Sequence, residues 1–292
     1  ETQERARGAA FVARMGANES VFAPSPRVRA AIAQASEGAW MYGDPESYDL
    51  RHALATHHQT HLDNIMVGEG IDALLGLLVR LYVGAGDAVV TSSGAYPTFN
   101  YHVAGFGGTL HTVPYKDDHE DPDALIAKAA EVSAKLVYIA NPDNPMGSWH
   151  RADVMQDMIN RLPEGCMLVL DEAYIDLAPA GTAPALDTNA ANVVRMRTFS
   201  KAYGMAGGRV GYRMRSADVI AGFHKVRNHF GMCRISQEGA LAALQDSAWL
   251  AHIQNEVDKA RQRIGAIAQA SGLTPLPSAA NFVTIDCGRD GA

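Results

Sequence analysis

The segment Lys135-Leu-Val-Tyr-Ile-Ala-Asn-Pro-Asp-Asn-Pro-Met-Gly147 (KLVYIANPDNPMG) contains a short run that is apolar at almost every position, followed by a rigid polar turn. Such a run predicts a strand with both faces covered, as in a parallel sheet between two layers of helices. The turn presents amide side chains where the strand ends. Because ligands of such sheets bind beyond the carboxyl ends of the strands, the segment predicts an α/β fold and the place of its site.

The sequence on both sides of this segment repeats the pattern from about residue 64 to residue 210. Short β-rich runs alternate there with stretches whose apolar residues recur at three- and four-residue spacing, which predicts an α/β domain with a largely parallel sheet. We expect strands at residues 87–91, 109–113, 135–140, 167–170 and 192–197, and helices at residues 71–82, 121–131 and 152–160.

The two ends of the chain differ from this central pattern. Residues 26–35 predict a short helix that begins with proline, and residues 237 to about 270 predict one or two long helices. Residues 281–287 predict a last strand, which leads into the glycine-rich residues 288–291. We therefore expect a further C-terminal segment after residue 292, and the absence of an initial methionine leaves room for a removed leader.

These observations divide the chain into three parts. We expect an N-terminal arm with part of a small domain at residues 1–40, and a large domain at residues 41–236. The small C-terminal domain then comprises residues 237–292 and is incomplete.

Composition argues against several classes of protein. Apolar residues make up 47% of the 292, which is enough for a sizeable core. Acidic residues outnumber basic ones by 32 to 25, and the basic residues are scattered, which disfavours binding to nucleic acid or to an anionic membrane. The sequence shows no apolar run of membrane-spanning length, and no signal peptide is visible in it. Three widely spaced cysteines favour buried thiols in a reducing cytosol over disulfides or a zinc site, so we expect a cytoplasmic protein without a metal.

Polar or aromatic side chains follow four of the predicted strands. Taken singly, each has an ordinary structural interpretation, such as a turn, a helix cap, a core ring or a surface lysine. Their convergence on one edge of the sheet favours a shared site instead. In chain order these residues are Phe99, Asn144, Asp171, Tyr174, Thr198, Ser200, Lys201 and Arg209.

One chemistry that needs this set is Schiff-base catalysis with pyridoxal phosphate. A buried carboxylate, here Asp171, keeps the pyridine nitrogen of the cofactor protonated. Phe99 offers an aromatic face for the ring, and Asn144 and Tyr174 offer donors for its phenolic oxygen. A desolvated lysine near other cations can lose its proton near neutral pH, so Lys201 is predicted to form the Schiff base and then to act as the base.

The phosphate of this cofactor needs backbone amides at a helix N-terminus, hydroxyl groups and a guanidinium. Glycines between Lys201 and Arg209 let the backbone turn tightly enough to return the guanidinium to that phosphate. The residues expected to bind the phosphate are Gly70, Ile71, Asp72, Thr198, Ser200 and Arg209.

Seven motifs follow one another along nearly the whole chain: Asn18-Glu19, Tyr42, 68–72 (GEGID), 96–99 (YPTF), 141–147 (NPDNPMG), 171–174 (DEAY) and 200–209 (SKAYGMAGGR). In this order they resemble the fold-type I aminotransferases of class I/II, and among them the histidinol-phosphate aminotransferases. The resemblance implies a PLP-dependent transferase (aspartate aminotransferase-like) fold, with a mostly parallel sheet in the large domain and a smaller α+β domain.

The resemblance also implies an activity and an assembly. An amino group would pass from an amino acid or an amino-alcohol phosphate to a 2-oxo acid such as 2-oxoglutarate, in amino-acid biosynthesis. The enzyme would be a homodimer with shared active sites, in which Tyr42 reaches the cofactor phosphate of the partner subunit.

Several positions depart from the pattern of that family. Ser20-Val21 stands where the family has Asn-Pro, Met146 replaces a threonine, and Gly208 replaces a leucine. Residues 228–234 also differ in a region that shapes the family's substrate pocket, and no arginine before Ala292 matches the one that binds substrate in the family. These departures concern the substrate more than the cofactor.

Three other functions remain open at this point. A decarboxylase of a phosphorylated amino acid, such as phosphothreonine, would use the same cofactor site. A non-catalytic protein that binds pyridoxal phosphate is a second alternative, although no DNA-binding module accompanies the site. A nucleotide-binding protein is disfavoured, because Gly84-Ala-Gly86 and residues 105–108 lack the spacing of the known phosphate-binding loops.

Overall fold

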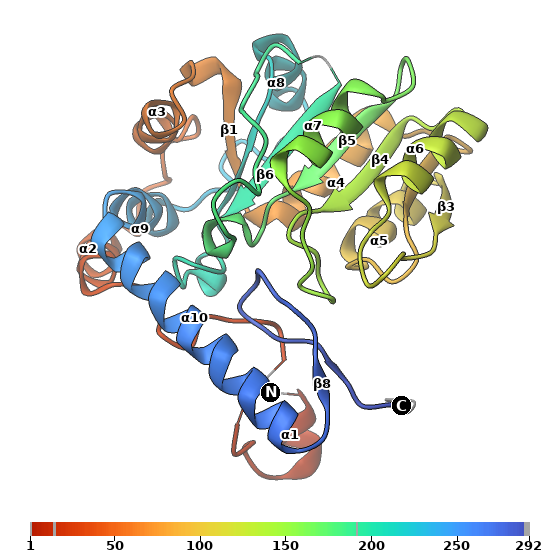
Figure 1. The fold of residues 1–292 in the computed structure, drawn as a ribbon. Coiled ribbons are helices and arrows are strands. Elements are labelled where there is room, and N and C mark those ends of the chain that lie inside the picture. Colours follow the sequence, from red (N-terminus) through yellow and green to blue (C-terminus); the bar gives the residue numbers. More distant parts are fainter. Residues whose placement is uncertain (1, 14–15, 191, 289–292) are drawn as a thin grey trace.

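The computed structural model describes residues 2–13, 16–190 and 192–288. A sheet flanked by helices forms the larger part, and a long helix runs below it beside the two ends of the chain (Figure 1). Residues 289–291 of the expected glycine-rich loop lie outside the described residues.

The described residues contain one sheet of seven strands, in the order β1-β7-β6-β5-β4-β2-β3. Strand β7 runs antiparallel to both of its neighbours, β1 and β6, and the other four pairings are parallel, so the predicted largely parallel sheet is confirmed. The sequence-based prediction omitted β1 and β7. The strands are β1 (Ile65–Gly68), β2 (Ala88–Ser92), β3 (Thr109–Val113), β4 (Leu136–Ala140), β5 (Met167–Asp171), β6 (Val193–Thr198) and β7 (Gly211–Met214).

Helices follow most of the strands, as predicted, and others form the two ends of the chain. Residues 237–270 form parts of two helices that are separated by a two-residue break. The helices are α1 (Thr2–Arg7), α2 (Pro26–Ser36), α3 (Tyr48–His57), α4 (Gly70–Tyr82), α5 (Thr98–Gly105), α6 (Pro122–Glu131), α7 (Ala152–Asn160), α8 (Ala217–His224), α9 (Arg234–Leu244) and α10 (Ser247–Ala270).

The core has a layer on each face of the sheet. Leu74 of α4, Phe99 of α5 and Phe223 of α8 are fully buried on one face. Leu125 of α6 and Met155 of α7 are fully buried on the other. Burial on both faces explains why β4 and β5 are apolar at nearly every position.

A third cluster joins α2, α3, α9 and α10 beside β1 and β7. Helix α9 crosses the predicted domain boundary at residue 237 and packs against α2 and α3. The three-part division of the chain therefore stays a prediction.

The predicted last strand at residues 281–287 is much shorter than expected. Only Ile285–Asp286 (β9) pairs, with Thr274–Pro275 (β8). Asn281, the first residue of this segment, binds elsewhere: its Nδ2 donates to Asn18 O at 2.8 Å, and just before it Ala279 N donates to Gly147 O at 2.8 Å. The C-terminal segment thus contacts both the N-terminal arm and the turn that follows β4.

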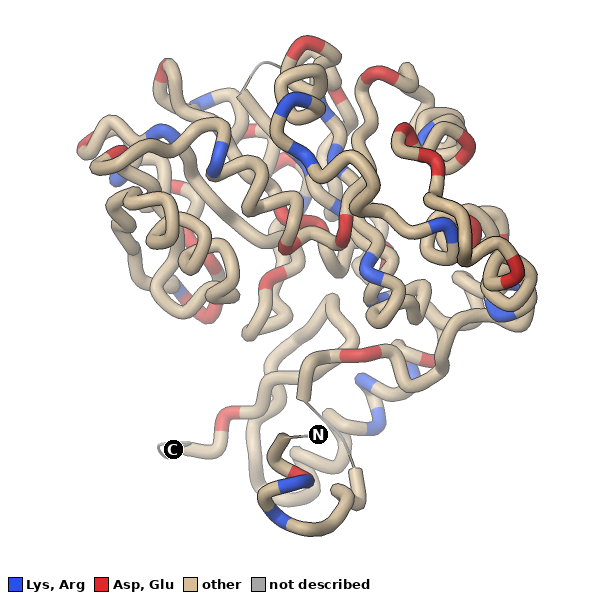
Figure 2. Tube along the Cα trace, turned by 180° about the vertical axis from the view of Figure 1, so that it is seen from behind, with Lys and Arg blue, Asp and Glu red and all other residues tan. Residues whose placement is uncertain are grey.

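Acidic and basic residues are interspersed over the face shown in Figure 2. Within the described ranges, no helix combines the length and the apolar character needed to cross a membrane. The cytoplasmic location expected from the sequence stays a prediction.

Candidate active site

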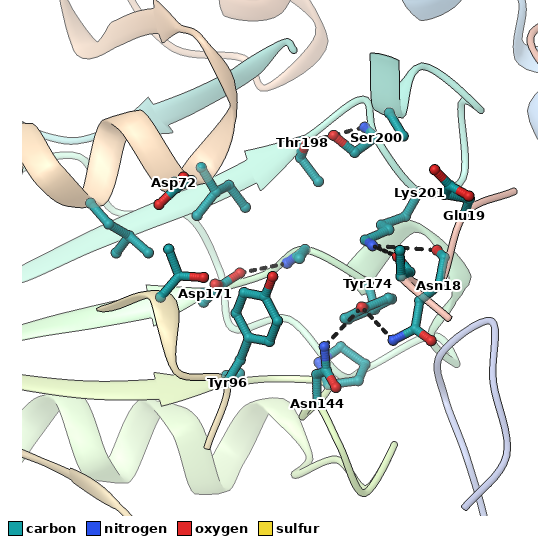
Figure 3. A pocket seen from close by; sticks show the side chains of 18 of the residues that line it. Asn18, Glu19, Asp72, Tyr96, Asn144, Asp171, Tyr174, Thr198, Ser200 and Lys201 are labelled. Atoms are coloured by element: carbon teal, nitrogen blue, oxygen red, sulfur yellow. Dashed lines mark hydrogen bonds between the residues drawn. The ribbon is translucent and has the colours of Figure 1, made fainter. Parts of the chain in front are cut away.

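A cavity of about 500 Å³ lies where the parallel strands end. Register brings these ends together, since Ala140 of β4 pairs with Asp171 of β5, which pairs in turn with Met196 of β6. The wall includes many of the predicted site residues, most of them labelled in Figure 3: Ile71, Asp72, Asn144, Asp171, Tyr174, Thr198, Ser200, Lys201 and Arg209.

Asp171 is the last residue of β5, and its carboxyl is buried in the cavity wall. Its Oδ2 accepts a hydrogen bond from Tyr138 Oη at 2.8 Å, and its Oδ1 accepts one from Ala173 N at 2.9 Å. Both donors are neutral, and burial raises the pKa of this carboxyl to about 6. A cation in the cavity would stabilise its charged form.

Lys201 reaches into the same cavity from the loop after β6 (Figure 3). Its Nζ donates to Ala17 O at 3.1 Å and to Asn18 O at 3.3 Å. Desolvation lowers the pKa of this amine, against the opposing effects of Asp171 and Glu19. The lysine therefore loses its proton more easily than a solvated one, as a nucleophilic amine requires.

One end of the cavity is built to hold an anion. Ser200 N donates to Thr198 Oγ1 at 3.1 Å, and Arg209 Nη1 lies 3.4 Å from Ser200 Oγ. Arg209 adopts a left-handed backbone conformation with φ 50°, after the short 3₁₀ turn Ala206–Gly208. Two hydroxyls and a guanidinium thus gather beside the N-terminus of α4, whose first amides have no partner within the helix.

The start of α4 contributes backbone more than side chains. Gly70 has φ +83°, a conformation that favours glycine, and a Cβ at this position would push the Arg209 guanidinium out of place. Gly70 itself does not line the cavity. The Asp72 carboxylate pairs with His102, at 2.8 Å between Oδ1 and Nε2, which leaves its backbone amide as the group available to an anion.

Tyr174 forms another part of the wall, between two amide side chains. Asn144 Nδ2 and Asn18 Nδ2 each donate to Tyr174 Oη at 3.3 Å. Burial raises the pKa of this phenol above its ordinary value, so it stays protonated near neutral pH and can donate into the cavity.

The structure places Phe99, the predicted aromatic platform, in the core and not in the cavity wall. Its ring is fully buried in the core and stacks on Tyr138, with the centroids 4.8 Å apart. Phe99 occupies the first turn of α5 and points to the core with Val103, four residues on. From the same segment, the ring of Tyr96 lines the cavity, together with those of Tyr138 and Tyr174 (Figure 3 labels Tyr96 and Tyr174).

Two further observations change the predicted site. Ala17, Asn18 and Glu19 line the cavity, although only the motif Asn18-Glu19 drew attention in the sequence and no role was assigned to it. We call residues 17–19 the strap, because they lie across Lys201. Tyr42 lies outside the wall and is exposed, with its ring 4.7 Å from that of Phe230. The described residues contain no cluster of ligands for a metal ion.

Comparison with known proteins identifies the family. The model for aminotransferases of class I and II matches residues 12–290. A histidinol-phosphate aminotransferase from Anaeromyxobacter sp. (strain Fw109-5) is 36% identical over 296 residues, which cover 100% of this chain and 81% of the relative.

Solved structures give the same result. The histidinol-phosphate aminotransferase from Sinorhizobium meliloti, in complex with pyridoxal-5'-phosphate, is 54% identical with a TM-score of 0.97, over 99% of this chain and 79% of that one. Aspartate aminotransferase from Thermus thermophilus with maleate shares the fold, with a TM-score of 0.86 at 22% identity over 98% of this chain and 80% of that one. This chain belongs to the aminotransferases of class I and II, so the predicted family, fold class and enzyme class are confirmed.

Proposed function

We propose that this aminotransferase takes an amino group from an amino-alcohol phosphate or amino acid of the histidinol-phosphate kind. The acceptor would be a 2-oxo acid such as 2-oxoglutarate. The names of the relatives support the donor, and the amino-acid and 2-oxo acid chemistry of the family supports the acceptor. The observation that carries the proposal is that Lys201 shares one cavity with the buried carboxyl of Asp171 and an anion-binding end.

The donor set of the cavity fits pyridoxal 5'-phosphate, the cofactor of this family. Hydroxyls and the Arg209 guanidinium suit its phosphate, and the Asp171 carboxyl, which has only neutral donors, suits a protonated pyridine nitrogen. When bound, the cofactor supplies an electron sink for the substrate carbon that loses a proton. The predicted cofactor is thereby confirmed for the family to which this chain belongs.

Lys201 has two proposed roles, which its environment supports. Its Nζ forms the covalent link to the cofactor and, when substrate releases it, moves a proton to and from the substrate carbon. A lowered pKa keeps a larger share of this amine neutral near pH 7, as both roles require. The strap lies across the amine, and Ala17 O and Asn18 O accept hydrogen bonds from Nζ when it is not linked to the cofactor.

The other residues are proposed to bind and orient the cofactor. Asn144 and Tyr174 would donate toward its phenolic oxygen, and Tyr96 would stack on its ring in place of Phe99. The proposed phosphate ligands are the backbone amides of Gly70, Ile71 and Asp72 together with the side chains of Thr198, Ser200 and Arg209.

A homodimer is proposed on the basis of an exposed aromatic patch. Trp40, Met41, Tyr42 and Phe230 are all exposed, which is unusual for large apolar side chains that lie close together. Burial against a second copy would cover them and bring Tyr42 toward the partner's cofactor phosphate.

The test is an assay of amino transfer with purified protein, with histidinol phosphate or an aromatic amino acid as donor and 2-oxoglutarate as acceptor. We expect a yellow dimeric protein with the highest kcat/KM for histidinol phosphate. Lys201→Ala should lose at least about 10³-fold in kcat together with the covalent link, because it removes both the link and the base.

Lys201→Arg is the matched control, since it keeps the positive charge but cannot form the link. Transfer that is no faster from histidinol phosphate than from the aromatic amino acid would contradict the proposed donor. Release of carbon dioxide without keto-acid exchange would contradict amino transfer itself.

A further inference from the structure

Two carboxyl groups lie together behind the turn that carries Asn144. Glu120 and Asp143 are each 2% exposed, and the Glu120 carboxyl is a hydrogen-bonding neighbour of the Asp143 carboxyl. Glu120 comes from the segment before α6, and Asp143 from the turn after β4. Neither residue lines the cavity.

All donors to this pair are neutral. Glu120 Oε2 accepts from Ser92 Oγ at 2.6 Å, and its Oε1 accepts from Ala140 N at 2.8 Å. The Asp143 carboxyl accepts from Tyr115 Oη at 3.1 Å and from Met146 N at 3.1 Å. Within the described part of the chain, neither carboxyl forms an ion pair with a lysine or arginine.

Two adjacent buried carboxyls without a cation cannot both be charged at neutral pH, because neither water nor a counter-charge offsets their repulsion. One proton between them removes one charge and supplies the donor that links the two oxygens. The titratable groups that face the pair do not offer another solution: they are the phenols Tyr115 and Tyr138, the carboxyl Asp171, and His150, whose Nε2 lies 2.7 Å from the backbone oxygen of Glu120.

The pair holds the turn from both of its ends. Through Ala140 N, Glu120 binds the last residue of β4, and through Met146 N, Asp143 binds the far side of the turn. Asp143 N also donates to Ser148 O at 2.9 Å. Asn144 lies between these anchors, and its side chain reaches Tyr174 in the cavity wall (Figure 3).

We propose that Glu120 and Asp143 share a single proton and that this pair is a positioning element, which holds Asn144 in place for the cofactor. The role of Asn144 in cofactor binding rests on the proposed function, whereas the shared proton does not. Loss of the proton places two negative charges side by side, and the turn that joins them opens. Neither residue touches the cofactor or the substrate.

The burial that favours a shared proton also sets the pH range in which the pair loses this proton. Desolvation, followed by the charge of Asp143, raises the pKa of Glu120 to about 8. The pair therefore holds its proton at pH 7 and loses it by pH 9. If only the protonated form positions Asn144, the apparent dissociation constant of pyridoxal phosphate rises about tenfold between these values.

The experiment compares the wild-type protein with Glu120→Gln and Asp143→Asn, each of which replaces the proton by a permanent amide donor. Glu131→Gln is the matched control, because Glu131 lies on the surface of α6 and pairs with Lys128. Infrared spectra in D₂O between pH 7 and 9 report a protonated carboxylic acid, and Asp171 is largely ionised in this range. Hydrogen exchange of residues 141–148 and cofactor affinity by visible absorbance complete the measurements.

We expect the acid band in the wild type and in Glu131→Gln at pH 7, its loss by pH 9, and its absence from both pair variants. The alkaline increases in exchange and in the dissociation constant should be about tenfold smaller in the pair variants. A wild type without an acid band at pH 7 would overturn the shared proton, and equal pH dependence in all four proteins would overturn the positioning role. A protein that binds no cofactor would refute the proposed function, while the infrared and exchange results would still decide whether the pair exists.

Discussion

Asp171 and Glu172 are neighbours at the end of β5, and one lines the cavity while the other packs behind it. Asp171 has neutral donors, and burial raises its pKa to about 6. Burial acts on Glu172 in the same direction, but Arg197 and Arg195 outweigh it and hold its pKa below the ordinary value. Their contacts with Glu172 are 2.9 Å from Arg197 Nε and 2.7 Å from Arg195 Nη2.

Two aromatic residues that follow β2, Tyr96 and Phe99, differ in the same way. Phe99, behind the wall, is fully buried and stacked on Tyr138, whereas Tyr96, in the wall, is 48% exposed. The residues behind the wall therefore have partners within the protein: the Glu172 carboxylate pairs with two arginines, and the Phe99 ring stacks on Tyr138. The wall leaves a carboxyl and a ring face for a ligand to complete, which is a stability cost that binding sites commonly carry.

The strongest test of this comparison is Glu172→Ala, which leaves the buried guanidinium of Arg195 and the largely buried one of Arg197 without their carboxylate. We expect the free energy of unfolding to fall by about 3–5 kcal/mol, as measured by urea denaturation of the cofactor-free protein at pH 7. The control is Glu131→Ala, which removes an exposed ion pair with Lys128 and should have an effect several times smaller. Equal losses of unfolding free energy in the two variants would contradict the view that Glu172, behind the wall, stabilises the fold through its arginine partners.

Asp171→Asn should change stability in the opposite direction. The folded-state pKa of about 6 lies above the ordinary 3.8, so the folded protein holds the proton longer and the free energy of unfolding falls as pH rises from 4 to 6. At pH 7 this loss is about 3 kcal/mol. The variant escapes it because an amide has no charge.

Thermal unfolding of the cofactor-free proteins at pH 4 and pH 7 checks this prediction. Asp171→Asn should be more stable than the wild type at pH 7 and similar to it near pH 4, although it should lose most of its turnover. A difference that is independent of pH would show that the charge of Asp171 is not its cause.

The smallest expected effect concerns the two aromatic rings. Tyr96→Ala should weaken the binding of pyridoxal phosphate about threefold to tenfold, the value of one stacking contact, with little change in stability. Phe99→Leu should lower the free energy of unfolding and leave the affinity for pyridoxal phosphate nearly unchanged, since the Phe99 ring contributes to the core. Fluorescence titration and urea unfolding of both variants separate the two effects, and a larger loss of affinity in Phe99→Leu would restore the original assignment.

Sequence patterns predicted the strands that end at the cavity because strands buried on both faces are apolar throughout. The residues just after such strands, including Asp171 and Lys201, could then be placed at one edge by topology alone. The sequence could not predict whether Tyr96 or Phe99 faces the cavity, because this depends on the path of the turn after Gly94, whose φ is +108°. The four-residue spacing of Phe99 and Val103 was the available signal, since it marks the buried face of α5.

Other features depend on contacts that no local pattern contains. Glu120 lies in a polar stretch that resembles a surface loop, and only its contacts with Ser92 and Ala140 place it inside. The charged residue Arg213 interrupts the apolar pattern of β7, which explains why that strand was not predicted. The strap gains its position through Asn281, at the other end of the chain.

That last contact has a consequence for how the enzyme is made. Asn281 and Asn18 are 263 positions apart, and a ribosome delivers the first of these residues long before the second. The sheet can assemble from neighbouring segments during translation, whereas the strap waits for its anchor until residue 281 has emerged. Closure over Lys201 therefore follows assembly of the sheet, and a nascent chain that stops before residue 281 would leave this lysine without its tethered cover.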